Sequence, residues 1–200
     1  MNSQAKIGLI ILAAGASERF GAPKQLLCFR GETLLRRIAR EAIESVCQPI
    51  VLVFGKDAEK FAEHLEEFDV FNARSDDWQE GMGNSISTGI EKLLEIDEEI
   101  DGAVLAVCDQ PFVTSKIINR LVGNFYQCEA LIVASAYSDT LGVPVLFSRR
   151  LFPELTALKG RGGAKEVIAR FSNQVVAVDF PEGAFDIDTP EDFRQLEENK

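Results

Sequence analysis

The sequence predicts an α/β protein of three layers, in which a mostly parallel, twisted sheet carries helices on both faces. Short apolar runs typical of buried strands recur along the chain, at 7–12, 50–54 and 103–107 among others. Segments with the apolar spacing of helices separate these runs, and such alternation favours a parallel sheet. Because the 200 residues are 46% hydrophobic and no stretch is typical of a linker, we expect one domain over 1–200.

The first half of the chain is expected to form strands and helices in turn. The run 7–12 is rich in branched apolar residues, as a central strand covered on both faces requires. Thr33 is placed to cap the helix that follows. Residues 72–89 are expected to be irregular until a helix begins near their end. The elements expected here are strands at 7–12, 50–54 and 69–72 and helices at about 34–45, 57–67 and 86–96.

The second half continues the pattern toward a late strand and a final helix. The expected elements are strands at 103–107, 130–134, 143–147 and 175–178 and a helix near 115–125, with the last helix starting close to Pro190. In sheets of this kind, ligands bind beyond the carboxyl ends of the strands. Residues that directly follow a strand are therefore the first candidates for a site.

Charge is distributed unevenly along the chain. The formal net charge of −11 argues against nucleic acid as a partner, because a phosphate backbone is bound by a basic surface. Residues 1–40 nevertheless contain seven Lys or Arg against two acidic residues, so a compact anion would be drawn there. We expect Arg36, Arg37 and Arg40 only to form the solvated face of a helix.

The cysteines and the apolar runs bear on the compartment. Four cysteines are scattered without a CxxC pair, and His64 is the single histidine, which disfavours zinc and disulfides. No apolar run has the length of a transmembrane span or the form of a signal peptide. We therefore expect a cytoplasmic protein that has no membrane partner.

The strand at 7–12 ends in a loop that favours phosphate binding. Residues 13–17 have almost no side-chain bulk, so backbone N–H groups can close around an anion, while Arg19 and Lys24 add charge. The glycine spacing excludes a Walker loop, and Ser17 stands where the dinucleotide fingerprint requires glycine. The alternative is a small-residue connection with no ligand. The candidate nucleotide-binding residues of this loop are Leu12, Ala13, Ala14, Gly15, Ser17, Arg19 and Lys24.

Two carboxylates stand where a strand ends and where the last helix begins. Asp109 follows the strand at 103–107, at the edge of the sheet where the loop would hold phosphates, and a carboxylate there can hold Mg²⁺. Thr189 and Asp192 suffice to start the last helix, so Asp188 is not needed as its cap. The alternatives are a turn aspartate before proline and a cluster that only begins a helix.

Residues 12–27, LAAGASERFGAPKQLL, resemble the opening of the nucleotidyltransferases that attach a nucleotide to molybdopterin. Among these, the chain most resembles the molybdenum cofactor cytidylyltransferases. The resemblance extends from Ile7 to about Leu196 and includes DIDTPED at 186–192. It implies the fold of the nucleotide-diphospho-sugar transferases, which is Rossmann-like, and transfer of CMP from CTP to molybdopterin with release of pyrophosphate.

The resemblance also implies roles for individual residues. It makes Asp109 and Asp188 the ligands of Mg²⁺, and it places Gly81 and Ser85 in the nucleoside pocket. Trp78 belongs to the same stretch, either as pocket wall or as a packing anchor. The catalytic residues implied are Arg19, Lys24 and Asp109.

Two elements near the expected second substrate depart from the family pattern. GRGGAK at 160–165 resembles an element written GDxGAR or GDxGAK, with Arg161 in place of the acidic residue. Val143 stands where the family usually has histidine before proline. Arg161 and Lys165 would favour an anionic group, which a molybdopterin phosphate supplies. A purely structural glycine turn is the alternative.

The expected reaction needs no histidine. A phosphate oxygen of the acceptor attacks the α-phosphorus and pyrophosphate leaves; with a second pKa of about 6, the acceptor phosphate is already ionised near neutral pH. Lys24 and the metal act on the developing charge, and Arg19 with the loop amides on pyrophosphate. The alternatives are guanylyl transfer from GTP, a sugar-phosphate nucleotidyltransferase, and a non-catalytic accessory protein that hands the cofactor to a molybdenum enzyme.

Overall fold

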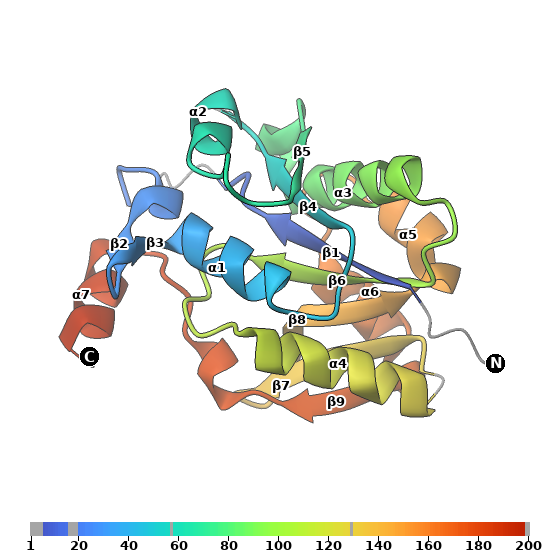
Figure 1. Cartoon of the computed structure of the whole chain (residues 1–200). Coiled ribbons are helices and arrows are strands. Elements are labelled where there is room, and N and C mark those ends of the chain that lie inside the picture. Colours follow the sequence, from blue (N-terminus) through green and yellow to red (C-terminus); the bar gives the residue numbers. More distant parts are fainter. Residues whose placement is uncertain (1–5, 16–19, 57, 129, 199–200) are drawn as a thin grey trace.

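A computed structural model describes residues 6–15, 20–56, 58–128 and 130–198, and within them the chain builds one large sheet between two layers of helices (Figure 1). The sheet has seven strands in the order β5-β4-β1-β6-β8-β7-β9. Only β8 runs antiparallel to its neighbours, so the predicted fold class is confirmed. The strands are β1 (Ile7–Leu12), β4 (Ile50–Phe54), β5 (Phe71–Arg74), β6 (Gly102–Val107), β7 (Ile132–Tyr137), β8 (Thr140–Ser148) and β9 (Val175–Asp179).

The helices divide between the two faces of the sheet. On one face lie α1 and α4, and on the other lie α3, α5 and α6 (Figure 1). A small hairpin of β2 and β3 precedes α1. The bounds are β2 (Cys28–Phe29), β3 (Glu32–Thr33), α1 (Leu34–Ile43), α2 (Ala58–Glu63), α3 (Met82–Ile96), α4 (Ser115–Cys128), α5 (Phe152–Thr156), α6 (Ala164–Arg170) and α7 (Pro190–Glu198). Among the described residues, no helix is both long and apolar enough to cross a lipid bilayer.

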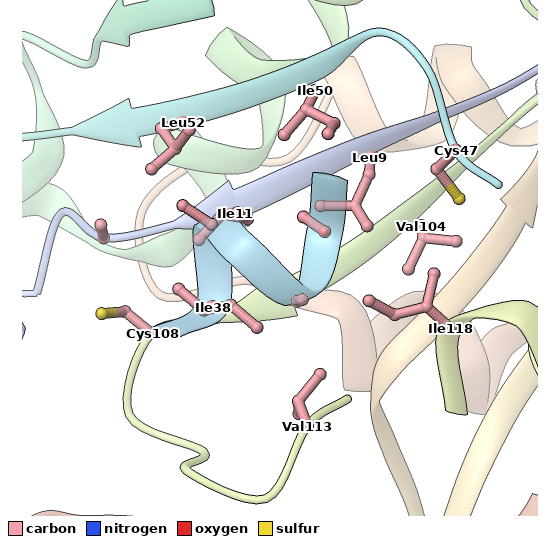
Figure 2. Close-up of a cluster of buried hydrophobic side chains, with 14 of the residues drawn as sticks. Leu9, Ile11, Ile38, Cys47, Ile50, Leu52, Val104, Cys108, Val113 and Ile118 are labelled. Atoms are coloured by element: carbon pink, nitrogen blue, oxygen red, sulfur yellow. The ribbon is translucent and has the colours of Figure 1, made fainter. Parts of the chain in front are cut away.

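Successive residues of β1 supply the cores on opposite faces of the sheet, because side chains alternate along a strand. Leu9 and Ile11 belong to the cluster that contains Ile38 of α1 (Figure 2). Ile10 belongs to the second cluster, which contains Ile86 of α3. All six residues of β1 are buried, as predicted for a central strand.

Several elements differ from the sequence-based expectation, which has no counterpart for α5, α6 or the β2–β3 hairpin and places β7 two residues too early. Helix α3 begins at Met82, four residues early, because Gly81 adopts a positive φ of 142° and starts the helix there. Helix α2 ends at Glu63 because the chain then tightens into short turns that bury Leu65. Strand β5 lies two residues later than expected, in the register that pairs it with β4. The expected strand at 143–147 extends back to Thr140 and joins β7 through a tight turn.

Strand direction brings the key loops to one edge of the sheet. β1, β4 and β6 are mutually parallel, and β7 runs the same way as β6 because β8 lies antiparallel between them. The segments that follow β1, β6 and β7 therefore open onto the same edge. This is the edge at which the sequence predicts a ligand.

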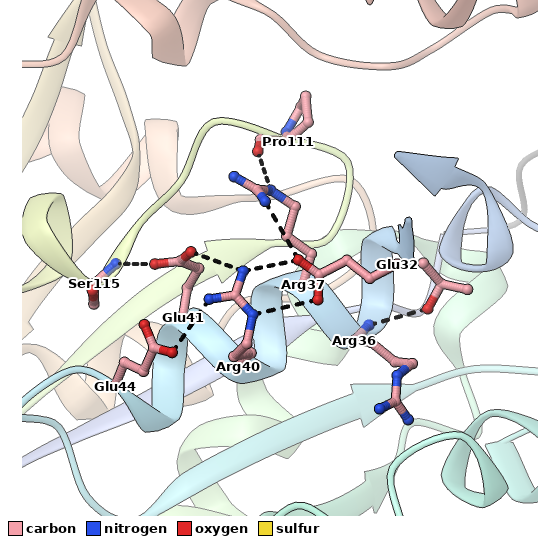
Figure 3. A network of polar contacts seen from close by, with 9 residues as sticks. Glu32, Arg36, Arg37, Arg40, Glu41, Glu44, Pro111 and Ser115 are labelled. Atoms are coloured by element: carbon pink, nitrogen blue, oxygen red, sulfur yellow. Dashed lines mark hydrogen bonds and ion pairs between the residues drawn. The ribbon is translucent and has the colours of Figure 1, made fainter. Parts of the chain in front are cut away.

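A network of charged residues fixes the turn after β6 (Figure 3). Nε of Arg37 donates to the Pro111 carbonyl at 2.7 Å, and a Glu41 carboxylate oxygen accepts the Ser115 N–H at 2.8 Å. The Arg37 side chain is only 12% exposed. The expectation that it forms part of a solvated helix face is therefore wrong. These bonds hold the segment between β6 and α4 against α1, and Asp109 is the second residue of that segment.

Candidate active site

Lys24, Asp109 and Asp188 meet at the carboxyl edge of the sheet. Nζ of Lys24 lies 2.7 Å from Oδ1 of Asp188 and 3.7 Å from Oδ2 of Asp109. Lys24 opens a short 3-10 helix after the phosphate-type loop, Asp109 follows β6, and Asp188 precedes α7. Lys24 and Asp188 are 164 residues apart in the chain. The structure therefore brings together the cation and the two carboxylates that the sequence singles out, and the chemical role of each stays a prediction.

The start of α7 leaves the carboxylate of Asp188 available to the site. The Asp192 carboxylate accepts the backbone N–H groups of Asp188 at 2.9 Å and of Thr189 at 2.7 Å. The Thr189 hydroxyl oxygen accepts the Asp192 N–H at 3.3 Å, which completes a capping box. In the same region, the Ile187 N–H donates to the Asp109 carbonyl at 3.0 Å and ties the two carboxylate segments together.

The charges at this edge are not balanced by the described residues alone. Burial raises the pKa of the Asp109 carboxyl; Lys24 opposes the shift, and Asp186 and Asp188 add to it. Partial burial likewise raises the pKa of Asp186, and Asp188 adds to that shift. Burial also raises the pKa of the Cys108 thiol beside them, which keeps the sulfur protonated. A cation at this edge would relieve the repulsion among the carboxylates.

A cleft of about 690 Å³ opens next to this cluster. Every described residue that the sequence assigns to the nucleotide lines it, whereas Ser17 and Arg19 lie outside the described residues. The loop after β1 forms one wall and the first turn of α3 forms the other. The lining residues are Leu12, Ala13, Ala14, Gly15, Lys24, Gln25, Trp78, Gln79, Gly81, Met82, Ser85, Val107, Cys108 and Asp109.

Gln25 shapes the loop, and sequence reasoning missed it. Its Nε2 donates to the carbonyls of Ala13 at 2.7 Å and Gly15 at 3.3 Å, and the residue is only 5% exposed. Holding both carbonyls fixes the loop backbone around a small concavity that faces the cleft. The feature of the sequence that could have marked this role is a polar residue placed between Lys24 and two leucines.

Trp78 is both a wall of the cleft and a packing anchor. Its ring lies so close to Gly55, just beyond β4, that a Cβ there would sit 2.5 Å from a ring carbon. The missing side chain of Gly55 therefore lets the indole lie against the backbone. Both interpretations of Trp78 left open by the sequence apply together.

Gly81 is explained by a loop contact. A Cβ on Gly81 would lie 2.1 Å from the Gly160 carbonyl oxygen, and its φ of 142° is one that other residues rarely adopt. The sequence predicts this glycine as a place where the backbone approaches the nucleoside. It does line the cleft, but the structural reason for glycine is the close contact with the 160–163 loop.

Replacing Gly81 by alanine is expected to lower the free energy of unfolding by at least about 2 kcal/mol, because it combines a backbone clash with a strained φ. Gly123→Ala is the matched control. Gly123 lies inside α4 and an added Cβ meets nothing within 4 Å, so this change should stabilise the protein by about 0.5–1 kcal/mol. Urea unfolding of both variants measures the change in unfolding free energy. Equal changes in the two variants would contradict a constraint at Gly81 from its contact with Gly160.

Of the two residues assigned to the second substrate, Lys165 lines a pocket and Arg161 does not line the same one. Lys165, in the first turn of α6, lines a second pocket of about 590 Å³ together with Tyr137, Thr140 and Leu141. Its charge also acts on Asp186 and lowers the pKa of that carboxyl against the effect of burial. Arg161 is exposed and lines neither this pocket nor the cleft.

The family model that matches this chain makes it a nucleotidyltransferase, and the order of the strands in its sheet agrees with that class. It belongs to the family whose model is described as MobA-like NTP transferase domain, which matches residues 9–176.

Known proteins similar to this chain carry different names. It is 33% identical over 136 residues to a probable molybdenum cofactor guanylyltransferase of Bacillus cytotoxicus, a match that covers 66% of this chain and 65% of that protein. It is 28% identical over 200 residues to nicotine blue oxidoreductase of Paenarthrobacter nicotinovorans, covering 94% of each. These two relatives are named for different activities, so their names do not agree on one substrate.

The structure of Rv0371c from Mycobacterium tuberculosis has the same fold along nearly the whole chain. It is 30% identical, covers 97% of this chain and 98% of its own, and superposes with a TM-score of 0.78. A second structure of that protein is a complex with manganese. It is 28% identical to this chain and superposes with a TM-score of 0.77, and the match covers 98% of this chain and 100% of the Rv0371c chain.

Proposed function

We propose that this protein transfers the nucleotidyl group of a nucleoside triphosphate to the phosphate of molybdopterin and releases pyrophosphate. The observation that carries the proposal is the contact of Lys24 with both Asp109 and Asp188 at the mouth of a cleft of nucleotide size. A cation between two carboxylates, beside a loop of backbone N–H groups, suits the charge of a triphosphate and its metal.

The two carboxylates fit a hard divalent cation. Mg²⁺ commonly binds proteins through one or two carboxylates and takes its other ligands from water and phosphates, and Asp109 and Asp188 would supply those two. When bound, the metal would neutralise phosphate charge during the transfer. The manganese complex of Rv0371c supports a divalent ion at this fold.

The residues of this chain would act mainly by position and charge. An ammonium has three N–H donors, so Lys24 can contact a phosphate while it remains close to the carboxylates. The loop after β1, held open by Gln25, would bind the pyrophosphate that leaves, with Arg19 nearby in the sequence. The acceptor phosphate is already ionised near neutral pH, so the site needs no general base.

The pocket that contains Lys165 is the proposed place for the acceptor. It opens at the same edge of the sheet as the cleft, where β7 and β8 meet. Lys165 supplies a positive charge for a phosphate there, and Tyr137 and Leu141 offer a mixed surface to an organic ring system. Arg161 lies outside this pocket, and we assign it no contact with the acceptor.

The nucleotide donor that we propose is CTP. The resemblance to the cytidylyltransferases implies CTP, whereas the name of the Bacillus cytotoxicus relative favours GTP as a second candidate. The test is pyrophosphate release from CTP, GTP, UTP and ATP, with Mg²⁺ and with or without molybdopterin, together with the mass of the product. We expect CMP joined to molybdopterin. Faster transfer from GTP would assign guanylyl transfer, and no release with any donor would overturn the proposal.

A further inference from the structure

The backbone N–H and carbonyl of one residue, Gly160, join the loop at 159–163 to the first turn of α3. The carbonyl of Gly160 accepts the N–H of Gly83 at 3.0 Å, and the N–H of Gly160 donates to Oδ1 of Asn84 at 3.0 Å. Both partners belong to the first turn of α3, which lines the cleft. The glycines at 81 and 83 leave room for this approach, since a Cβ on either would meet the 159–162 backbone at 2.9 Å or less.

Asn84 also holds the segment that precedes α3 and carries Trp78. Its Nδ2 donates to the Asp77 carbonyl at 3.0 Å and to a Glu80 carboxylate oxygen at 3.1 Å. Trp78, which is a wall of the cleft, lies between these two residues. The amide of Asn84 therefore joins the segment 77–80, the start of α3 and the loop at 159–163.

The loop at 159–163 leads directly into α6, whose first turn carries Lys165. The loop belongs to no strand of the sheet, and its contacts with α3 determine how it lies relative to the cleft. Asn84 therefore holds the loop that leads to Lys165 as well as the segment that carries Trp78. Asn84 itself lines neither the cleft nor the acceptor pocket.

We infer that Asn84 is a positioning residue that couples the nucleotide cleft to the acceptor pocket. The inference rests on the proposed function, because it takes these two cavities as the sites of donor and acceptor. Ordering the 77–80 segment around a nucleotide steadies the 159–163 loop and so tightens acceptor binding. Linkage requires the acceptor to tighten nucleotide binding by the same factor.

Two variants of Asn84 separate its bond to the 159–163 loop from its bonds to the 77–80 segment. Asn84→Ala removes all three hydrogen bonds of the side chain. Asn84→Asp keeps an acceptor for the Gly160 N–H but loses both donated bonds and places a charge beside Glu80. Ser87→Ala is the matched control, because the Ser87 hydroxyl also donates from α3 to a distant carbonyl, that of Thr156 at 3.0 Å.

The experiment measures the dissociation constant of molybdopterin with and without a methylene-bridged CTP or GTP that cannot be transferred. In the wild-type protein the nucleotide should tighten molybdopterin binding, and in Asn84→Ala this tightening should disappear, with KM for molybdopterin raised roughly tenfold. Asn84→Asp should raise KM for the nucleotide and leave KM for molybdopterin close to wild type. Ser87→Ala should match the wild type in both constants.

Hydrogen exchange provides a measurement that does not depend on turnover. The Gly160 amide should exchange faster in Asn84→Ala and at the wild-type rate in Asn84→Asp and Ser87→Ala. Full coupling in Asn84→Ala, or equal loss of coupling in Ser87→Ala, would overturn the inference. A wild-type protein that binds neither molybdopterin nor any nucleotide would instead overturn the proposed function, and the inference with it.

Discussion

Replacing Lys24 by alanine is expected to slow nucleotidyl transfer by at least about 10²- to 10³-fold, because it removes preorganised positive charge from the reacting phosphates. Its ammonium contacts both carboxylates at the edge of the cleft, and its side chain is only 13% exposed. The effect should fall on kcat more than on KM for the nucleotide, since the loop amides remain. Initial rates of pyrophosphate release measure it.

The same variant should bind Mn²⁺ at least as tightly as the wild type, because the ammonium no longer competes for Asp109 and Asp188. Lys92→Ala is the control, since Lys92 pairs with Glu95 on the surface of α3 at 2.9 Å, away from the cleft. If Lys24→Ala retains near wild-type release of pyrophosphate, Lys24 has no part in the transfer.

Asp109→Asn is expected to abolish turnover and at the same time to stabilise the folded protein at neutral pH. Burial raises the pKa of Asp109, with Asp186 and Asp188 adding to the shift. At pH values below the ordinary pKa of an aspartate, the carboxyl is neutral in both folded and unfolded chains. As pH rises from there through the raised pKa, the unfolded chain ionises first and stability is lost. Asparagine carries no charge and avoids this loss.

Urea unfolding of wild type and Asp109→Asn between pH 4 and pH 8 measures this difference. The variant should show a smaller decline of the unfolding free energy with rising pH, and added Mn²⁺ should stabilise the wild type but not the variant. Asp76→Asn is the control, because Asp76 is exposed and, within the part of the chain that the structure describes, forms an ion pair only with Arg74, at 2.9 Å. A variant that is less stable than wild type at neutral pH would contradict the assigned electrostatics.

Much of the candidate site could be predicted because it depends on local signals. Asp109 follows an unbroken apolar run, which fixes the end of a strand and therefore the edge of the sheet. Asp188 could be separated from its neighbours because Thr189 and Asp192 form a recognisable capping box. Lys24 follows from the loop motif. In each case a few adjacent residues determine where the functional group lies.

The remaining features depend on contacts between distant segments. Asn84 and Gly160 are 76 residues apart, and nothing local marks either as a partner. The start of α3 was placed too late because the glycines at 81 and 83 favour a loop until the 160–163 segment packs on them. Arg161 and Lys165 are close in sequence, but α6 begins between them; Lys165 in its first turn lines the acceptor pocket, whereas Arg161 lines neither that pocket nor the cleft.

The most direct test of the central claim is a crystal structure of the protein with Mn²⁺ and a nucleoside triphosphate, with the metal located by its anomalous signal. The claim predicts that Mn²⁺ contacts carboxylate oxygens of both Asp109 and Asp188 and that the triphosphate lies against residues 13–15 and Lys24. A metal bound elsewhere, or a triphosphate outside the cleft, would contradict it.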